Sequence, residues 1–266
     1  KMDRILEIDR ENLVAVVQPG VIVQTLNDAI KEFGLIYPPD PGTVTTATMG
    51  GTVAECAGGL RGLKYGVTKH YVMGLEIVLP DGEIFRVGGK TVKNVTGYDL
   101  AKLFTGSEGT LGIITEITVK LIPAPEYRLG LMAVFQNLDQ AALTISDIIK
   151  NKVIPATLEI MDNTTIRTVE NFSRVGLPVD AEAILLIEVD GIEEVVQREF
   201  DTVKKVCQDH GVAELKIATN DEEREVLWTA RRNALPALAQ FKPTTILEDA
   251  TVPRSQIPAM IRRVRE

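Results

Sequence analysis

The glycine-rich part of this chain opens with the stretch ATMGGTVAECAGG, residues 47–59. Fourteen of the 21 glycines lie between Gly50 and Gly112, and only three follow Leu131. Because paired glycines have no Cβ atoms, their backbone N–H groups can sit against a flat ring or a phosphate oxygen. The alternative that the residues leave open is a run of tight turns in a glycine-rich β domain.

Three further blocks lie outward from this stretch: PPDPGT at residues 38–43, KYG at 64–66 and TGSEGTLGIIT at 105–115. The Gly-x-Gly-x-x-Gly fingerprint of Rossmann dinucleotide sites does not occur anywhere in the sequence. Gly89-Lys90-Thr91 is similar to the end of a phosphate-binding P-loop, but Ile84 stands where the first glycine is required. We therefore interpret Lys90 as a solvated residue at the end of a hairpin.

The order and spacing of these blocks resemble the FAD-binding domain of the vanillyl-alcohol oxidase superfamily, in the group of the glycolate oxidase catalytic subunit and D-lactate dehydrogenase. The resemblance covers nearly the whole chain, including GYDL at residues 97–100 and EDATVP at 248–253. It implies an α+β fold, in which part of a p-cresol methylhydroxylase (PCMH)-type FAD-binding domain precedes a ferredoxin-like substrate (cap) domain with an antiparallel sheet. We expect these domains over residues 1–124 and 125–266, because two prolines in LIPAP, residues 121–125, close a strand and begin a connector.

The resemblance also assigns FAD contacts. Thr48 to Gly51 and Cys56 to Gly59 would line the flavin, Gly112 to Ile114 would face the adenine end, and Glu108 would hold that loop. The full set of candidate cofactor-binding residues is Pro39, Asp40, Pro41, Thr48, Met49, Gly50, Gly51, Cys56, Gly58, Gly59, Tyr65, Gly66, Glu108, Gly112, Ile113 and Ile114.

Departures from the family pattern matter as well. The family usually carries an Arg-Gly-x-Gly-Thr loop for the pyrophosphate upstream and a histidine-rich metal and catalytic segment downstream, and residues 1–266 contain neither. We therefore expect a fragment that lacks both ends, binds FAD weakly by itself and contains no metal site or general base. Cys56 stands where we expect asparagine, and we interpret it as a small buried residue, the alternative being a covalent link to the flavin.

The rest of the chain alternates helices and strands. We expect strands near Leu13–Gln18, Tyr71–Leu79, Glu83–Val87, Gly112–Leu121, Tyr127–Phe135, Ala156–Met161, Glu182–Val189, Val212–Ile217 and Thr244–Val252. We expect helices near Val23–Phe33, Leu138–Lys150, Ile192–His210 and Asp221–Gln240, the last kinked at Pro236. The second half fits parallel βαβ units or a ferredoxin-like sheet. Apolar and polar residues alternate in several strands, which suggests a sheet with one wet face and favours the antiparallel arrangement.

Arg231 is the candidate substrate residue. It shares one stripe with Trp228 on a helix that Asn220 would cap. Burial of an arginine on an apolar stripe of a helix costs free energy unless the guanidinium binds an anion. The planar guanidinium is suited to bidentate binding of a carboxylate. The alternative is a structural ion pair with an acid such as Glu248. Since Trp-x-x-Arg is similar to the family's substrate-carboxylate arginine, we assign Arg231 that role and expect Arg232 to face solvent.

Composition narrows the class of function. Apolar residues make up 45% of the chain, and a net charge of −8 argues against nucleic acid as a partner. Two cysteines and two histidines are too few for a disulfide framework or a convincing metal centre. No apolar stretch reaches the length of a membrane span, so we expect a cytoplasmic protein, with peripheral attachment through a partner left open.

Together these features predict FAD-dependent oxidation of a small D-2-hydroxy acid, such as glycolate or D-lactate, to the 2-oxo acid. An iron–sulphur subunit or another electron-accepting subunit is the expected partner. Two alternatives remain open: a non-redox transferase similar to the ether-lipid alkyl transferases, and a subunit that binds flavin or a partner without catalysing a reaction.

Overall fold

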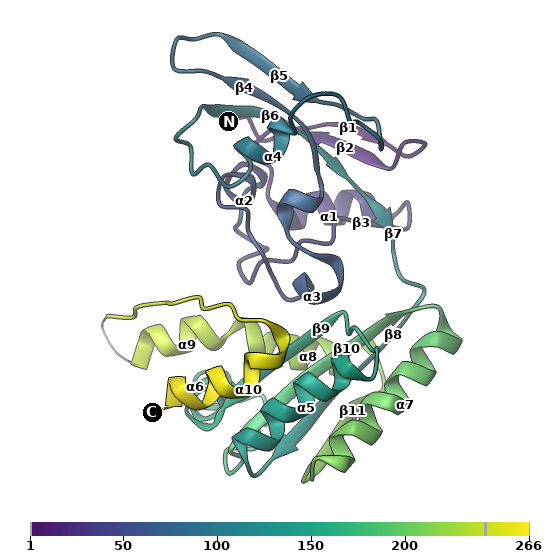
Figure 1. The fold of residues 1–266 in the computed structure, drawn as a ribbon, viewed down its shortest axis with the longest axis vertical. Helices are drawn as coiled ribbons and strands as arrows, with labels where there is room; N and C mark the ends of the chain where they lie inside the picture. Colours follow the sequence, from purple (N-terminus) through teal and green to yellow (C-terminus); the bar gives the residue numbers. More distant parts are fainter. Residues whose placement is uncertain (1, 242–243, 266) are drawn as a thin grey trace. The chain divides into compact units, whose positions relative to one another are not determined.

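A computed structural model describes residues 2–241 and 244–265 of the chain (Figure 1). The chain divides into two compact units, one that runs to Ala124 and one that starts at Pro125.

The first unit is built on a five-stranded antiparallel sheet in the order β1-β2-β6-β4-β5. Its strands are β1 (Ile5–Asp9), β2 (Val14–Val17), β4 (Val72–Val78), β5 (Ile84–Gly88) and β6 (Ile113–Lys120). A separate ribbon pairs β3 (Leu35–Ile36) with β7 (Ile122–Pro123). The sequence predicted β2, β4, β5 and β6 to within one residue at each end, whereas β1 was not predicted.

Helices α1 (Val23–Lys31), α2 (Met49–Ala54) and α4 (Leu100–Phe104) share one hydrophobic core with this sheet. The predicted stripe of α1 is confirmed, because Val23, Leu26 and Ile30 are fully buried. Gly34 follows the helix with a φ of +66°, which glycine adopts without strain. A short helix α3 (Gly62–Tyr65) and a 3₁₀ turn η1 (Thr68–His70) complete the unit.

The second unit contains a four-stranded antiparallel sheet in the order β11-β8-β10-β9. Its strands are β8 (Tyr127–Phe135), β9 (Thr157–Asp162), β10 (Ala183–Gly191) and β11 (Glu214–Ala218). Helix α5 (Leu138–Lys150) connects β8 to β9, and α7 (Glu193–Asp209) connects β10 to β11. This is the expected ferredoxin-like arrangement, with an additional helix, α6 (Asn163–Ser173), inserted between β9 and β10.

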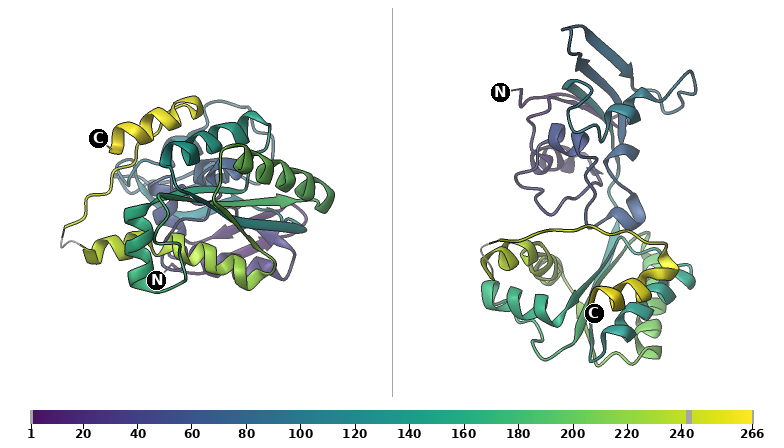
Figure 2. Two further views of the ribbon diagram at one scale, coloured as in Figure 1. Left: turned by 90° about the horizontal axis from the view of Figure 1, so that it is seen from below. Right: turned by 60° about the vertical axis from the view of Figure 1, so that its left-hand side comes forward.

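Both faces of this sheet are covered by helices (Figure 2). Helices α5 and α7 pack on one face, and α10 (Ile257–Arg265) packs on α5. Helices α6, α8 (Asp221–Arg232) and α9 (Ala234–Phe241) lie on the other face. Alternate residues of β10 therefore enter two different cores, with Leu185 on one side and Leu186 on the other. The prediction of one wet face is wrong, although the antiparallel arrangement inferred from it is confirmed.

Two further expectations need correction. Residues 244–253 form no strand, and Ile246 and Leu247 are exposed, because neither edge of the sheet is paired with this segment. The single helix expected over residues 221–240 is interrupted at Asn233, and Pro236 lies in the first turn of α9, where its missing N–H is tolerated.

Candidate functional site

Three of the predicted cofactor blocks, residues 38–43, 47–59 and 105–115, contact one another at α2 and the loop that follows it. The Thr48 side chain caps this helix, because its Oγ1 accepts a hydrogen bond from the Gly51 amide at 3.1 Å. The Gly50 amide donates to the Pro19 carbonyl at 2.8 Å, and the Met49 side chain is fully buried in the core. Within this block, Met49 is the buried member, Thr48 and Gly50 are partly exposed, and Gly51 is exposed.

The block of residues 39–41 is buried and lies against Gly59. The Leu60 amide donates to the Asp40 carbonyl at 3.1 Å, and a Cβ atom at Gly59 would lie 2.0 Å from that same oxygen. The Asp40 carboxylate also lies 3.8 Å from Nε of Arg61. Gly59 is thus required by the fold, because two backbone segments meet at this position.

The fold also explains why glycine occupies positions 66 and 112. Gly66 has a φ of +83°, and a Cβ atom there would lie 2.2 Å from Nδ1 of His70. A Cβ atom at Gly112 would lie 2.6 Å from the Ile77 side chain. These two glycines therefore support the alternative interpretation, in which glycine serves tight turns and packing.

Gly58 differs from its neighbours. It is exposed, its φ is not in the left-handed region, and a Cβ atom there would make only an ordinary 3.6 Å contact with Val67. The fold would accept an alanine at this position, so no internal contact explains Gly58. The expected contact of Gly51 and Gly58 with the flavin stays a prediction.

Two backbone hydrogen bonds hold the loop after α4 against the end of α2. The Gly106 amide donates to the Val53 carbonyl at 2.9 Å, and the Glu108 amide donates to the Ala54 carbonyl at 3.0 Å. The Glu108 carboxylate is exposed and makes no hydrogen bond within the described residues. The backbone therefore holds this loop, and a contribution from the carboxylate stays a prediction.

The start of β6 leads from this loop back to the sheet. Ile113 and Ile114 pair with Val78 and Ile77 of β4, and α2 packs against β6. The Ile113 side chain is 70% exposed, so this end of β6 offers apolar surface as well as backbone.

The structure explains why asparagine suits position 56. Cys56 has a φ of +50°, a left-handed conformation that asparagine tolerates better than most residues. The sequence predicted a buried side chain at this position, and this prediction is wrong because the Cys56 side chain is partly exposed. The other cysteine, Cys207, is fully buried, and this burial raises the pKa of its thiol to about 12.

Tyr65, another candidate cofactor residue, is the last residue of α3. Its carbonyl accepts a hydrogen bond from the Tyr71 hydroxyl at 2.8 Å, and Nζ of Lys64 lies 5.6 Å from the centre of its ring.

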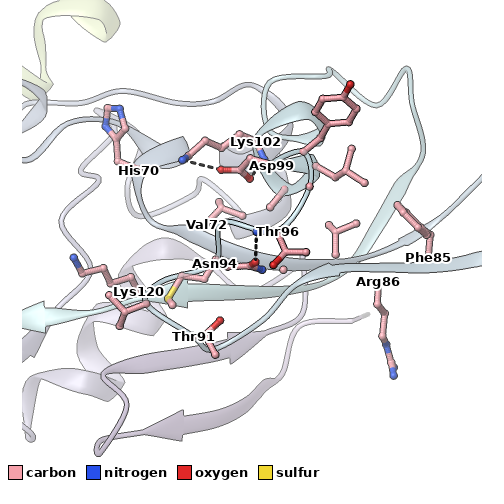
Figure 3. Close-up of a pocket in the computed structure, with 18 residues that line it drawn as sticks. His70, Val72, Phe85, Arg86, Thr91, Asn94, Thr96, Asp99, Lys102 and Lys120 are labelled. Carbon is pink, nitrogen blue, oxygen red and sulfur yellow. Dashed lines mark hydrogen bonds and ion pairs between the residues drawn. The ribbon is translucent and has the colours of Figure 1, made fainter.

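A pocket that the sequence did not predict lies in the first unit between β4, β5, α4 and the loop between β5 and α4 (Figure 3). Its volume is about 490 Å³. Asp99, from the GYDL block, caps α4 through the Lys102 amide and forms a 2.8 Å ion pair with the Lys102 side chain. The Lys102 hydrogen bond holds the pKa of Asp99 below its usual range. The visible role of Asp99 is thus to fix the start of α4.

In the second unit, one side of α8 faces acidic residues of the sheet. Nε1 of Trp228 donates a hydrogen bond to the buried Glu188 carboxylate at 3.1 Å, and Nε of Arg224 lies 3.9 Å from the same oxygen. Nε of Arg231 donates to Oε2 of Glu159 at 2.5 Å. Charged and polar contacts therefore attach α8 to β9 and β10.

Arg231 is partly exposed, with 36% of its side chain accessible. The alternative expectation, an ion pair between Arg231 and an acid, matches the contact that the structure shows, but the acid is Glu159 on β9 and not Glu248. Glu248 and Asp249 are exposed residues of the segment without a strand. Arg232 pairs with Glu225 on its own helix at 3.0 Å and is partly buried rather than solvent-facing.

The described residues offer neither a metal site nor a membrane-spanning helix. Residues 2–241 and 244–265 contain no group of three or more His, Cys, Asp or Glu side chains that could hold a metal ion. Within those same ranges, no helix is both long enough and apolar enough to cross a bilayer.

The neighbouring glycines 58 and 59 should respond differently to alanine. We expect Gly59→Ala to lower the free energy of unfolding by roughly 1–3 kcal/mol, because the new methyl group overlaps the Asp40 carbonyl. Gly58→Ala should stay within about 1 kcal/mol of wild type and weaken the binding of FAD, the cofactor that the resemblance implies. Urea unfolding and FAD titration of the complete gene product measure both effects. Wild-type FAD affinity in Gly58→Ala would refute a flavin contact at this position.

Position 56 should rank side chains by their tolerance of a left-handed backbone. We expect Cys56→Asn to raise the free energy of unfolding by part of the roughly 1–2 kcal/mol that this conformation costs, and Cys56→Val to lower it. Chemical denaturation of the three proteins provides the comparison. The explanation fails if the valine variant is as stable as the asparagine variant.

Comparison with known proteins places the chain in a family. Residues 124–266 match the family model described as "FAD linked oxidases, C-terminal domain". Residues 1–88 match the family model described as "FAD binding domain". The chain is 53% identical over 265 residues to glycolate oxidase subunit GlcD of Bacillus subtilis, covering 100% of this chain and 56% of that protein. It is 36% identical over 266 residues to D-lactate dehydrogenase of Anaerostipes hadrus, covering 97% of this chain and 55% of that protein. The chain thus spans about half the length of the curated relatives it matches.

Solved structures agree on the fold. An alkyldihydroxyacetonephosphate synthase aligns with a TM-score of 0.72 at 23% identity, covering 90% of this chain and 48% of that one. A p-cresol methylhydroxylase aligns with a TM-score of 0.68 at 19% identity, covering 85% of this chain and 50% of that one. The expected PCMH-type FAD-binding fold is therefore confirmed. The chain belongs to the FAD-linked oxidases, whose cofactor is FAD, and its first unit carries part of their FAD-binding domain.

Proposed function

We propose that the complete gene product containing this chain uses FAD to oxidise a small D-2-hydroxy acid to the 2-oxo acid. The observation that carries the proposal is Arg231, a partly exposed guanidinium whose Nε is held by the Glu159 carboxylate of β9. The glycolate oxidase subunit and D-lactate dehydrogenase to which the chain is similar act on compounds that share one feature, a hydroxyl group beside a carboxylate. A guanidinium is the side chain best shaped to grip that carboxylate.

Each unit would supply a different part of the reaction. Arg231 would hold the substrate carboxylate by two parallel N–H···O bonds and so fix the position of C2. The accessible backbone around α2, with Gly51, Gly58 and the start of β6, would hold the cofactor. When bound, FAD supplies a hydride acceptor, while the protein supplies orientation and electrostatics.

The electrons must then leave the flavin. The relative from Bacillus subtilis is named as a subunit of glycolate oxidase, which supports a further subunit as the electron acceptor. An iron–sulphur protein is one candidate for this role. A non-redox transferase remains the rival function, and it differs in one observable: its substrate would not bleach the flavin anaerobically.

Replacing Arg231 with lysine should harm turnover far more than folding. Lysine keeps the positive charge but loses the two-pronged geometry, and a displacement of C2 by about 1 Å can cost on the order of a hundredfold in rate. Stopped-flow reduction of the flavin by D-lactate, glycolate and D-2-hydroxyglutarate measures this effect, and the melting temperature should change only modestly. Arg232→Lys is the matched control, since Arg232 pairs with Glu225 on the same helix. Wild-type rates in Arg231→Lys with every active substrate would show that Arg231 is a structural ion-pair residue.

A further inference from the structure

The contact between Arg231 and Glu159 uses one edge of the guanidinium. Nε of Arg231 donates to Oε2 of Glu159 at 2.5 Å, and it is the one guanidinium nitrogen of this residue with a hydrogen-bond partner among residues 2–241 and 244–265. Within these ranges, the two terminal nitrogens of Arg231 therefore have no hydrogen-bond partner. A carboxylate that binds end-on requires those two nitrogens and no others.

Glu159 stands on a rigid support. It lies in β9 opposite Leu186 of β10, on the sheet face that α8 covers, and its side chain is only 21% exposed. On the same face, Glu188 of β10 lies diagonally from Glu159, because Glu188 pairs with Thr157. The two acids thus form a short row that is fixed by the register of the sheet.

Helix α8 is attached to this row at two points. Trp228 binds Glu188, and Arg231 binds Glu159 less than one helical turn later. Gly130 of β8 leaves room for Arg224, since a Cβ atom there would lie 3.4 Å from the stem of that arginine. The helix therefore has little freedom to rotate about its own axis, and the remaining freedom of Arg231 is in its side-chain torsions.

We infer that Glu159 is the positioning residue of Arg231: it holds the Nε edge so that the terminal nitrogens face the substrate carboxylate. This inference rests on the proposed function. A partly exposed ion pair adds little to stability, so its main effect is geometric, because it selects one rotamer of a long side chain. Glu159 touches neither substrate nor cofactor in this role.

Two substitutions separate geometry from charge. Glu159→Gln and Glu159→Ala both remove the negative charge, but only glutamine keeps an oxygen that accepts from Nε. We expect the glutamine variant to bind oxalate, a carboxylate probe with no C–H bond to oxidise, on the order of tenfold more tightly than the alanine variant. The same ranking is expected for flavin reduction at saturating glycolate, within the roughly hundredfold limit set by a 1 Å displacement. Isothermal titration and stopped-flow measurements on the FAD-loaded complete gene product give the two readouts.

Glu225→Gln is the matched control, because it removes the partner of Arg232 on the same helix and should change neither readout. If the alanine variant does not fold, Glu159→Asp replaces it, since aspartate keeps the charge but withdraws the acceptor, and it should rank below glutamine. Equal behaviour of the glutamine variant and the alanine or aspartate variant would overturn the inference, as would wild-type behaviour of all Glu159 variants.

Arg231→Lys, measured alongside, separates the two claims. Impaired Arg231→Lys with unimpaired Glu159→Ala removes only the positioning role. Unimpaired Arg231→Lys removes the carboxylate clamp of the proposed function, and the positioning role with it.

Discussion

Around α2, backbone segments approach one another more closely than a Cβ atom would permit. A side chain at Gly59 would overlap the Asp40 carbonyl at 2.0 Å, and one at Gly50 would overlap Pro19 at 2.5 Å. Because these positions carry no side chain, the segments around residues 19 and 106 can meet on a helix of six residues, and the segment around residue 40 can meet the loop that follows it. In the proposed function, the exposed backbone at Gly58 would contact the flat ring of FAD. The cofactor region thus depends on internal packing that most of its glycines serve.

In the second unit, contacts between α8 and the sheet determine the orientation of Arg231. Helix α8 meets the sheet through two acids, the buried Glu188 and the partly exposed Glu159, as well as through apolar side chains such as Ala230. Loss of a partner of the buried Glu188 is costly because it leaves an uncompensated charge, so the Glu188 contacts fix the rotation of the helix. Arg231 lies at the accessible end of the row that these two acids form. The same contacts that hold the helix therefore orient its guanidinium.

Much of the fold follows from local patterns, and the site follows only in part. The strands β2, β4, β6 and β8 were located because apolar runs end at turn residues such as Pro80-Asp81-Gly82. The short helix α2 was missed, since six residues with two glycines show no helical period, and the strand expected at residues 244–252 failed because alternation alone does not supply a neighbouring strand. Glu159 was missed as the partner of Arg231 because the two are 72 residues apart and only the strand register brings them together. A signal did exist: an acid inside an apolar strand such as TLEIM, residues 157–161, demands a partner.

The proposed function requires the transfer of a hydride from C2 of a 2-hydroxy acid to FAD. Anaerobic mixing of the FAD-loaded complete gene product with glycolate and with glycolate deuterated at C2, monitored by the visible absorbance of the flavin, tests this transfer. We expect glycolate or D-lactate to bleach the flavin, and deuterium at C2 to slow the bleaching because the C–H bond breaks in that step. A flavin that stays oxidised with every 2-hydroxy acid tested, in a protein that binds FAD stoichiometrically, would refute the proposed function.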